Sequence, residues 1–287
     1  MKNYLSLIKF SHTVFAMPFA LLGFFLGWLA EPQVFSWRLL GLVVLCMVFA
    51  RSAAMAFNRY LDRDIDAKNP RTRTREIPAG MISPSAALVF VAVNAALFVL
   101  CAWLINPLCF ALSPVAMVVV LGYSYTKRFT ALCHFVLGLG LSLAPIGAYL
   151  AVTGSFALLP ILYSFAVLFW VAGFDIIYAL QDEVFDRSLQ LNSVPARLGA
   201  VRALWLSRAL HFASASLIVY AGVLLSATYG RFSWLSGLSA ALFLGMLVYQ
   251  HTLVKAHDLS RVNLAFFTVN GIASLAFSAL LILDIFF

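Results

Sequence analysis

NRYLDRDIDAKNPRTRTREIPAG, from Asn58 to Gly80, is the stretch that decides the fold of this 287-residue chain. It holds ten of the chain's thirty charged residues, although the residues before it are almost wholly apolar. In the whole chain 63% of residues are hydrophobic and 10% are charged, and the mean hydropathy is +0.98. In a soluble domain about a quarter of the residues are charged. The sequence therefore predicts an integral membrane protein that gathers its charge at one surface.

The apolar runs have the length of membrane-spanning helices. They repeatedly reach the roughly 20 residues that an α-helix needs to cross the hydrocarbon, and they lack the alternation over roughly ten residues that marks a β-barrel. We therefore expect an all-α polytopic membrane protein in which residues 1–287 form one domain. The first run has no clear cleavage site and is expected to remain as an uncleaved helix. Breaks in hydrophobicity predict nine spans, at residues 10–30, 37–58, 85–105, 107–125, 131–152, 157–181, 203–227, 233–253 and 262–284.

The distribution of Lys and Arg predicts the orientation in the membrane. With a cytoplasmic N-terminus, fifteen of the nineteen basic residues fall on the cytoplasmic side, and Arg38 and Arg231 fall on the other. Arg51 and Arg208 lie within spans. The positive-inside rule then places the C-terminus outside. The net charge of +8 is explained by this topology and by anionic lipid, without nucleic acid.

Acidic residues recur every fourth position in the opening stretch. Asn58, Asp62 and Asp66 would share one face of a helix, and Arg51 would lie on roughly the same face, inside the membrane. The stretch FDIIYALQDEVFD repeats the pattern with spacings of three, four and four residues. Its members are Asp175, Tyr178, Asp182 and Asp186. Because ionisable residues within a span are costly and usually functional, the two acidic clusters indicate a site.

The chemistry of the two clusters points to a divalent cation. Carboxylates four residues apart repel each other, and burying them is costly, so a cation is expected between the clusters. Mg²⁺ prefers oxygen ligands and shares carboxylates with substrate phosphates, and two facing clusters would suit two ions and one diphosphate. Basic residues nearby would neutralise the remaining phosphate oxygens. These residues are Arg71, Arg75, Lys127 and Arg128. Arg63 and Asp64 point off the shared face and are expected to be solvated helix ends.

The motifs together resemble those of the UbiA superfamily of intramembrane aromatic prenyltransferases. The family pattern N-x-x-x-D-x-x-x-D is followed here by RTRTREIPAG, and FDIIYALQDEVFD matches the second family pattern. YSYTKRFT, residues 123–130, resembles the family's Tyr-rich segment. The resemblance implies nine helices around a central cavity that opens laterally to lipid, with cytoplasmic loops after spans 2 and 6 capping it. It also implies a bacterial inner membrane location.

The resemblance implies a Mg²⁺-dependent transfer of a polyprenyl group from its diphosphate to an aromatic ring. In this interpretation Asn58 contacts metal or phosphate, and the metal ligands are Asp62, Asp66, Asp182 and Asp186. Arg71, Arg75 and Arg128 contact the diphosphate, and the candidate catalytic residues are Arg51, Lys127, Asp175 and Tyr178. Either Asp175 or the diphosphate would remove the ring proton. Arg51 would pair with a carboxylate of the acceptor or form a salt bridge with Asp175.

The acceptor and the function class each leave an alternative open. KFSHTVFAMPFALLG, near the N-terminus, resembles bacterial family members of quinone biosynthesis, whose acceptors include 4-hydroxybenzoate and 1,4-dihydroxy-6-naphthoate. His12 stands where ubiquinone enzymes tend to have a Pro-containing start, which favours the naphthoate of menaquinone synthesis. A transporter would also place paired carboxylates in a helix bundle, but would spread them toward both faces.

The cysteines and histidines give weaker signals. The four cysteines lie in separate apolar stretches without C-x-x-C spacing, so neither a zinc site nor a disulfide is expected. His134 and His211 lie near helix ends without ligand spacing, which favours core or interfacial roles. A place in a loop that lines the site is left open for His251 and His257.

Overall fold

The computed structural model describes residues 2–7, 15–230 and 233–287, and it confirms the all-α prediction. The long helices are α2 (Met17–Ala30), α3 (Trp37–Leu61), α5 (Pro84–Ile105), α6 (Pro107–Thr126), α7 (Cys133–Thr153), α8 (Leu158–Ala179), α11 (Ala200–Tyr229), α12 (Trp234–Leu253) and α13 (Asn270–Phe286). Shorter helical segments are α1 (Lys2–Leu7), η2 (Pro32–Val34), α4 (Arg63–Lys68), η3 (Leu180–Asp182), α9 (Glu183–Ser188), α10 (Val194–Leu198) and the π-helical turn Leu264–Val269.

Each predicted span overlaps one of the long helices, although not all of these helices meet the requirements for a membrane crossing. Within the described residues, seven helices are long and apolar enough to span a membrane. The first of the nine predicted spans is represented by α2, which has only 14 residues, and α12 is not among the seven. The predicted start of the first span at residue 10, His12 and Arg231 lie outside the described residues.

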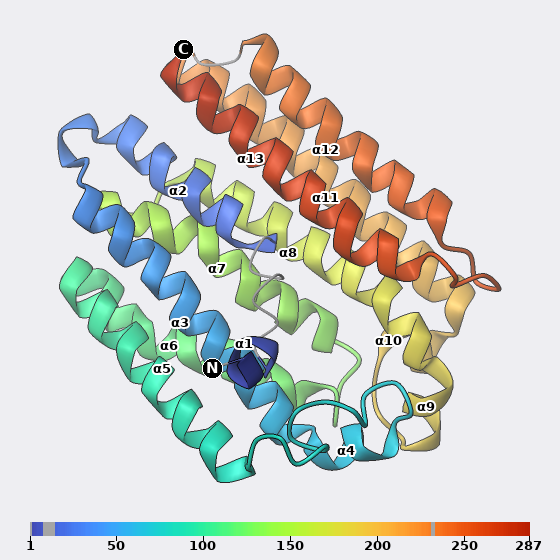
Figure 1. Ribbon diagram of the computed structural model, residues 1–287. Helices are drawn as coiled ribbons and strands as arrows, with labels where there is room; N and C mark the ends of the chain where they lie inside the picture. The colour runs from blue at the N-terminus through green and yellow to red at the C-terminus, as the bar shows by residue number, and fades with distance from the viewer. Residues whose placement is uncertain (1, 8–14, 231–232) are drawn as a thin grey trace.

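The long helices pack in sequence around the molecule (Figure 1). Neighbours in the chain contact each other from α5 through α8, then α8 contacts α11, and α13 returns against α2. Two glycines let a helix approach the backbone carbonyl of its neighbour. A Cβ on Gly23 of α2 would lie 2.1 Å from the carbonyl oxygen of Pro145, and one on Gly138 of α7 would lie 2.5 Å from that of Leu168. Helix backbones therefore come together where side chains are missing.

An aromatic cluster fills the centre of the fold. Trp170 of α8 packs against Phe19 of α2 with ring centroids 5.5 Å apart and against Phe243 of α12 at 5.7 Å. Phe277 of α13 lies 5.3 Å from Phe243, and all four side chains are almost completely buried. Within a membrane, helices associate through close van der Waals packing, so the contacts of these rings hold α2 and α8 to the C-terminal helices.

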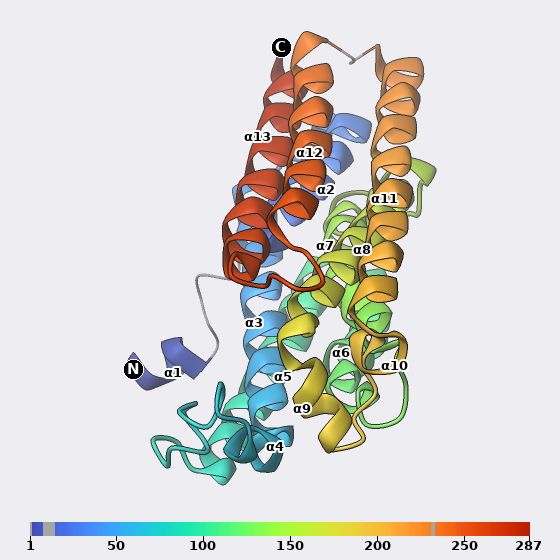
Figure 2. The same cartoon turned by 90° about the vertical axis from the view of Figure 1, so that its right-hand side faces the viewer.

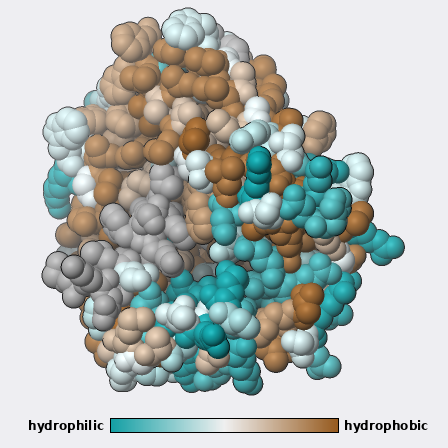
Figure 3. All heavy atoms as spheres, turned by 45° about the vertical axis from the view of Figure 1, so that its right-hand side comes forward, coloured by the Kyte–Doolittle hydropathy of each residue, from teal (hydrophilic) through white to brown (hydrophobic). Residues whose placement is uncertain are grey.

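The polar segments lie at one end of the helices. In Figure 2, α4, α9 and α10 lie at the end opposite the C-terminus, where the loop between α4 and α5 also lies. Figure 3 shows hydrophilic residues gathered in the lower part of the visible face, below a body covered mainly by hydrophobic residues. The charge of the opening stretch therefore forms a cap on an apolar bundle.

Candidate active site

The first acidic cluster lies at a break between two helices. α3 ends at Leu61, and Asp62 (φ −89°, ψ 6°) connects it to α4. Asn58 Nδ2 donates a hydrogen bond to Asp62 Oδ2 at 3.1 Å, which keeps these two residues on a common face. Asp66 follows in α4 and is buried. The expectation that all three project from one continuous helix is therefore wrong at Asp62.

The second acidic cluster has the same kind of break. α8 ends at Ala179, a 3₁₀ turn carries the chain to Asp182, and α9 begins at Glu183. Asp175 therefore belongs to the spanning helix, whereas Asp182 and Asp186 belong to the cap. Asp186 is fully buried, and Ser193 Oγ donates a hydrogen bond to its Oδ2 at 2.8 Å.

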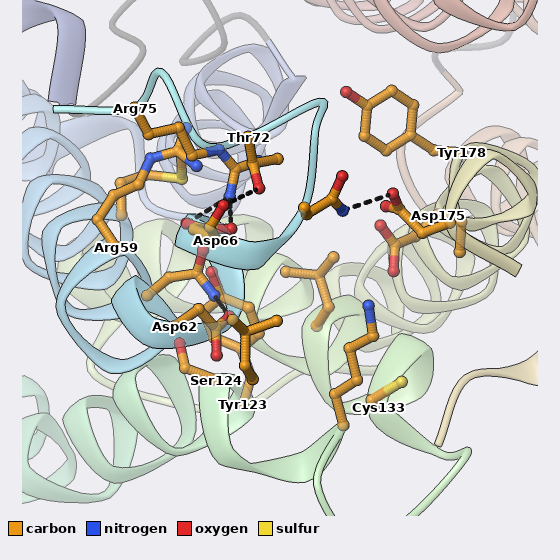
Figure 4. Close-up of a pocket in the computed structure, with 18 of the residues that line it drawn as sticks. Arg59, Asp62, Asp66, Thr72, Arg75, Tyr123, Ser124, Cys133, Asp175 and Tyr178 are labelled. Carbon is orange, nitrogen blue, oxygen red and sulfur yellow. Dashed lines mark hydrogen bonds and ion pairs between the residues drawn. The ribbon is translucent and has the colours of Figure 1, made fainter. Parts of the chain in front are cut away.

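Hydrogen bonds join the loop that follows the first cluster to the second cluster. Asn69 Nδ2 donates to Asp182 Oδ1 at 3.2 Å, and Arg71 Nε donates to the same oxygen at 3.1 Å. Arg71 also reaches the hydroxyl of Tyr178 at 3.2 Å. In Figure 4, Asp62 and Asp66 lie on one side of the pocket, and Asp175 and Tyr178 lie on the other. The loop after α4 therefore faces the end of α8, as two acidic clusters around one site require.

All twelve residues predicted for the site line a single cavity of about 600 Å³. They are Arg51, Asn58, Asp62, Asp66, Arg71, Arg75, Lys127, Arg128, Asp175, Tyr178, Asp182 and Asp186. By contrast, Asp64 is exposed and lies 3.7 Å from Arg63. The cavity also borders Phe174, Phe266 and Phe267, so apolar rings meet charged groups in the same space.

Each of the four predicted metal ligands forms an ion pair with one of the four predicted phosphate-binding cations. The closest distances are 3.3 Å for Asp62–Arg128, 2.7 Å for Asp66–Arg75, 2.5 Å for Asp182–Arg71 and 2.7 Å for Asp186–Lys127. From the sequence these cations are predicted to contact phosphate alone, and the structure adds the carboxylates as partners. Within the described residues, the carboxylates and the basic side chains neutralise each other pairwise.

Burial and neighbouring charges shift the pKa values of three site groups outside the spans. Burial, followed by the charge of Asp66, raises the pKa of Asp62, although Arg128 and Lys127 act against this. For Lys127 burial is the largest influence and lowers the pKa, but the charge and hydrogen bond of Asp186 and the charge of Asp182 give a net rise. Arg71 behaves in the same way beside Asp182 and Tyr178, so its pKa is also raised. The two cations are therefore fixed in their charged forms.

The donor set fits Mg²⁺ bound together with a phosphate group. The available ligands are carboxylate oxygens and the amide of Asn58, which are the hard donors that Mg²⁺ prefers. Asp186 Oδ1 is buried, and the ammonium of Lys127 lies 2.7 Å from it. No group of three or more His, Cys, Asp and Glu residues converges on one point in the described part of the chain. These residues therefore suit an ion that keeps water and phosphate ligands, and do not form an all-protein cage.

Arg51 lies where the polar cavity adjoins an apolar one. The second cavity, of about 370 Å³, lies among α3, α5, α6 and α7, and shares Arg51, Met55 and Tyr123 with the first. Arg51 Nε is buried without a hydrogen-bond partner. Asp175 instead contacts His134, with Nδ1 and Oδ2 2.7 Å apart. The alternative of a salt bridge between Arg51 and Asp175 is therefore wrong, and the guanidinium retains a buried donor facing the cavity.

Three further residues, which the sequence patterns do not indicate, line the wall of the cavity. His134 touches Asp175, and the buried Arg59 lines the cavity with its Nε unpartnered. Phe266 stacks on Tyr178 with ring centroids 4.0 Å apart. Phe266 belongs to the π-helical turn, a type of irregularity that is frequent at functional sites. The spacing of the histidines in the sequence does not predict the contact between His134 and Asp175.

His251 and His257 do not line the cavity. His251 Nε2 lies 2.9 Å from His211 Nδ1, so these two histidines join α12 to α11. His211 is buried and also contacts the carbonyl oxygen of Trp170, as a core role requires. All four cysteines are free.

Comparison with known proteins identifies the family. The model of the UbiA prenyltransferase family matches residues 16–272. The chain belongs to the UbiA prenyltransferase family. It is therefore a multi-pass membrane prenyltransferase, and the family assignment replaces the transporter alternative.

Individual relatives agree with the family assignment over most of their length. The chain is 32% identical over 259 residues to the 4-hydroxybenzoate octaprenyltransferase of Nitrosomonas eutropha, covering 89% of this chain and 87% of that protein. The apo structure of a UbiA homolog from Aeropyrum pernix K1 is 33% identical, with a TM-score of 0.83, covering 95% of this chain and 98% of that one. A UbiA homolog from Archaeoglobus fulgidus bound to DMAPP and Mg²⁺ has the same fold, with 24% identity, a TM-score of 0.74 and 99% of each chain covered.

Proposed function

We propose that this protein transfers a polyprenyl group from polyprenyl diphosphate to a carboxylated aromatic acceptor in quinone biosynthesis, in a Mg²⁺-dependent reaction. The observation that carries the proposal is the convergence of two acidic clusters and their paired cations on one cavity next to an apolar one. The charged cavity suits a diphosphate, and the apolar cavity suits the hydrocarbon part of a substrate. The Archaeoglobus fulgidus homologs bound to Mg²⁺ with GPP or DMAPP support the same assignment of ligands.

The residues divide the chemistry among them. Asp62, Asp66, Asp182 and Asp186 would hold Mg²⁺, with Asn58 beside them; the ion supplies positive charge to the diphosphate oxygens. Arg71, Arg75, Lys127 and Arg128 already lie against those carboxylates and contact the diphosphate as it leaves. Because these cations are fixed in position, they stabilise the negative charge that develops when the allylic C–O bond breaks.

The opposite wall of the cavity serves the aromatic acceptor. Tyr178 lines this wall, stacked on Phe266, and the guanidinium carbon of Arg71 lies 5.4 Å from the centroid of its ring, as the attraction of an aromatic face for cations favours. Asp175 lies one helical turn before Tyr178 on α8 and lines the same cavity. We assign it the removal of the ring proton after the new C–C bond forms.

Arg51 is assigned to the acceptor carboxylate. Arg51 lines both cavities, and its Nε is buried without a partner. A bidentate contact with a carboxylate would satisfy it. We expect Arg51→Gln to raise the KM of the acceptor on the order of 10- to 100-fold, because hydrogen bonds to charged groups contribute about 1.5–3 kcal/mol. Steady-state kinetics with purified protein measure this.

The two substrates provide the control for Arg51. The KM of the prenyl diphosphate is expected to stay within about threefold in Arg51→Gln, since the diphosphate cations are other residues. An increase confined to the diphosphate KM would contradict the role in acceptor binding.

Two acceptors are candidates for the ring. The names of the relatives support 4-hydroxybenzoate, which we therefore place first. The comparisons give no support to 1,4-dihydroxy-6-naphthoate, so the menaquinone-type acceptor stays a prediction from the N-terminal sequence. Both molecules carry the carboxylate that Arg51 would bind.

An acceptor panel tests the proposal. Purified protein in detergent is given a long-chain prenyl diphosphate, Mg²⁺ and each acceptor, and the prenylated product is followed by mass spectrometry. A product formed with only one of the two molecules identifies that molecule as the acceptor. Excess EDTA is expected to abolish product formation. Asp182→Ala should lose at least about 100-fold in turnover, whereas the exposed Asp64→Ala should retain it. Full turnover by Asp182→Ala, or no product with either acceptor, would refute the assignment.

A further inference from the structure

His134 connects the cavity to the polypeptide that supports it. It lies in the first turn of α7 and is only 2% exposed. Its Nδ1 is 2.7 Å from Oδ2 of Asp175 on α8, and its Nε2 accepts a hydrogen bond from the backbone N–H of Val194 at 3.2 Å. The imidazole ring therefore bridges a cavity residue and the segment that begins α10.

The backbone contact fixes which nitrogen carries the proton. An amide N–H can only donate, so Nε2 must be the unprotonated nitrogen of the ring. A neutral ring then carries its proton on Nδ1 and donates it to Asp175 Oδ2. The side chain of Asp175, which carries the second oxygen Oδ1, is 22% exposed and lines the cavity.

The same bridge is linked to the diphosphate end of the site. Val194 follows Ser193, whose Oγ donates to Asp186 Oδ2 at 2.8 Å. The ring of His134 therefore connects Asp175, through hydrogen bonds, to the segment whose Ser193 binds Asp186. Asp175 on the spanning helix and Asp186 in the cap are otherwise separated by the helix break at Leu180.

We propose that His134 is a positioning residue that holds the Asp175 carboxylate with its free oxygen directed at the ring carbon undergoing prenylation. This inference rests on the proposed function. In the step concerned, the allylic C–O bond breaks and the diphosphate keeps the electron pair. A ring carbon forms the new C–C bond, and the proton on that carbon passes to Asp175 Oδ1. His134 keeps its own proton throughout and touches no substrate.

Two substitutions of similar size separate this role from a purely structural one. In His134→Asn the amide nitrogen lies near the place of Nδ1, so it can still donate to Asp175 but cannot reach Val194. In His134→Gln the amide extends to the place of Nε2, so its oxygen can accept from Val194 while the contact with Asp175 is lost. A positioning role predicts that the Asn variant retains kcat within about threefold, while the Gln variant loses on the order of 100-fold. The KM of the prenyl diphosphate should not change in either.

A double variant gives the second test. If His134 acts through Asp175, His134→Gln should cost little further turnover once Asp175→Asn is present, because residues that act as a unit are non-additive. Turnover retained by the Gln variant and lost by the Asn variant would overturn the proposal, as would additive losses in the double variant. Wild-type protein that turns over neither acceptor would instead refute the proposed function.

The tautomer can be tested without turnover. Histidine ¹⁵N NMR of labelled protein in detergent, with the His134 signals assigned by their loss in His134→Gln, is expected to give the neutral, Nδ1-protonated ring. An Nε2-protonated ring at this position would overturn the geometry, whether or not an acceptor has been found.

Discussion

At the residue scale, Asp62 shows how the site opposes its own stability. Burial and the nearby Asp66 raise the pKa of this carboxyl above its ordinary value of 3.8. A carboxyl whose pKa rises on folding binds its proton more tightly in the folded state. The free energy of unfolding therefore falls as the pH rises from 3.8 through the raised value, and the loss is complete above it.

The substitution Asp62→Asn should therefore stabilise the metal-free protein at pH 7 while abolishing its activity. The amide keeps an oxygen that can accept from Asn58 and removes the buried charge. We expect a higher thermal midpoint in detergent, with the gain shrinking as the pH is lowered toward 3.8, and a turnover at least about 100-fold lower. Asp64→Asn, at an exposed site, is the control. A stability gain independent of pH would show that the charge is not the cause.

The composition of the site was predictable at this scale, whereas its contacts were not. Asn58, Asp62 and Asp66 recur at every fourth residue. This repeat can be seen in the sequence because it is local along the chain and does not depend on tertiary contacts. The contact between His134 and Asp175 joins residues 41 positions apart on two helices. Only packing of α7 on α8 brings them together, so no spacing in the sequence signals the pair.

At the element scale, the contact between α7 and α8 depends on a missing side chain. A Cβ at Gly138 would lie 2.5 Å from the carbonyl oxygen of Leu168, whereas a Cβ at Gly140 would meet nothing within 4 Å. The two glycines lie in the same helix, two residues apart. They therefore form a matched pair for testing the packing.

Gly138→Ala is expected to lower the free energy of unfolding by about 1–3 kcal/mol, the usual effect of overpacking. Gly140→Ala should leave it unchanged or raise it by up to about 1 kcal/mol, since alanine favours the helix. Unfolding of both variants in the same detergent measures the difference. Equal effects would mean that the helices do not meet at Gly138.

The helices themselves were predictable from the length of each apolar run, and most of their ends lie within about three residues of the predicted ones, whereas α13 begins at Asn270, after the π-helical turn, instead of at residue 262. The breaks at Asp62 and Leu180 were not, because a four-residue repeat continues unchanged across a short bend. What bends the chain is tertiary: Arg75 holds Asp66, and Asn69 and Arg71 hold Asp182. The π-helical turn at Leu264–Val269 was missed for a similar reason, since Asn270 supports it from the following helix by bonding to Phe266 and Ala265.

At the scale of the whole molecule, charge predicts the orientation in the membrane. The polar cap formed by α4, α9 and α10 lies opposite the C-terminus (Figure 2). With the cap in the cytoplasm, as the basic residues favour, a reporter fused after Phe287 lies outside. Alkaline phosphatase fused there should be active in a bacterial host, and green fluorescent protein should be dark. The opposite result would place the diphosphate site on the outer side.

The pairing of every acidic ligand with a basic neighbour has a consequence for how the site fills. A phosphate group that binds alone meets guanidinium and ammonium groups already paired with carboxylates. A divalent ion that binds alone meets carboxylates already paired with these cations. When the metal ion and the diphosphate bind together, each carboxylate exchanges its basic partner for the metal ion, and each basic side chain exchanges its carboxylate for phosphate. The charges therefore stay balanced. Occupancy by one ligand then raises the affinity for the other by an equal factor, as thermodynamic reciprocity demands. If the proposed roles of these residues hold, we expect the resting protein to bind free phosphate or a lone divalent cation only weakly.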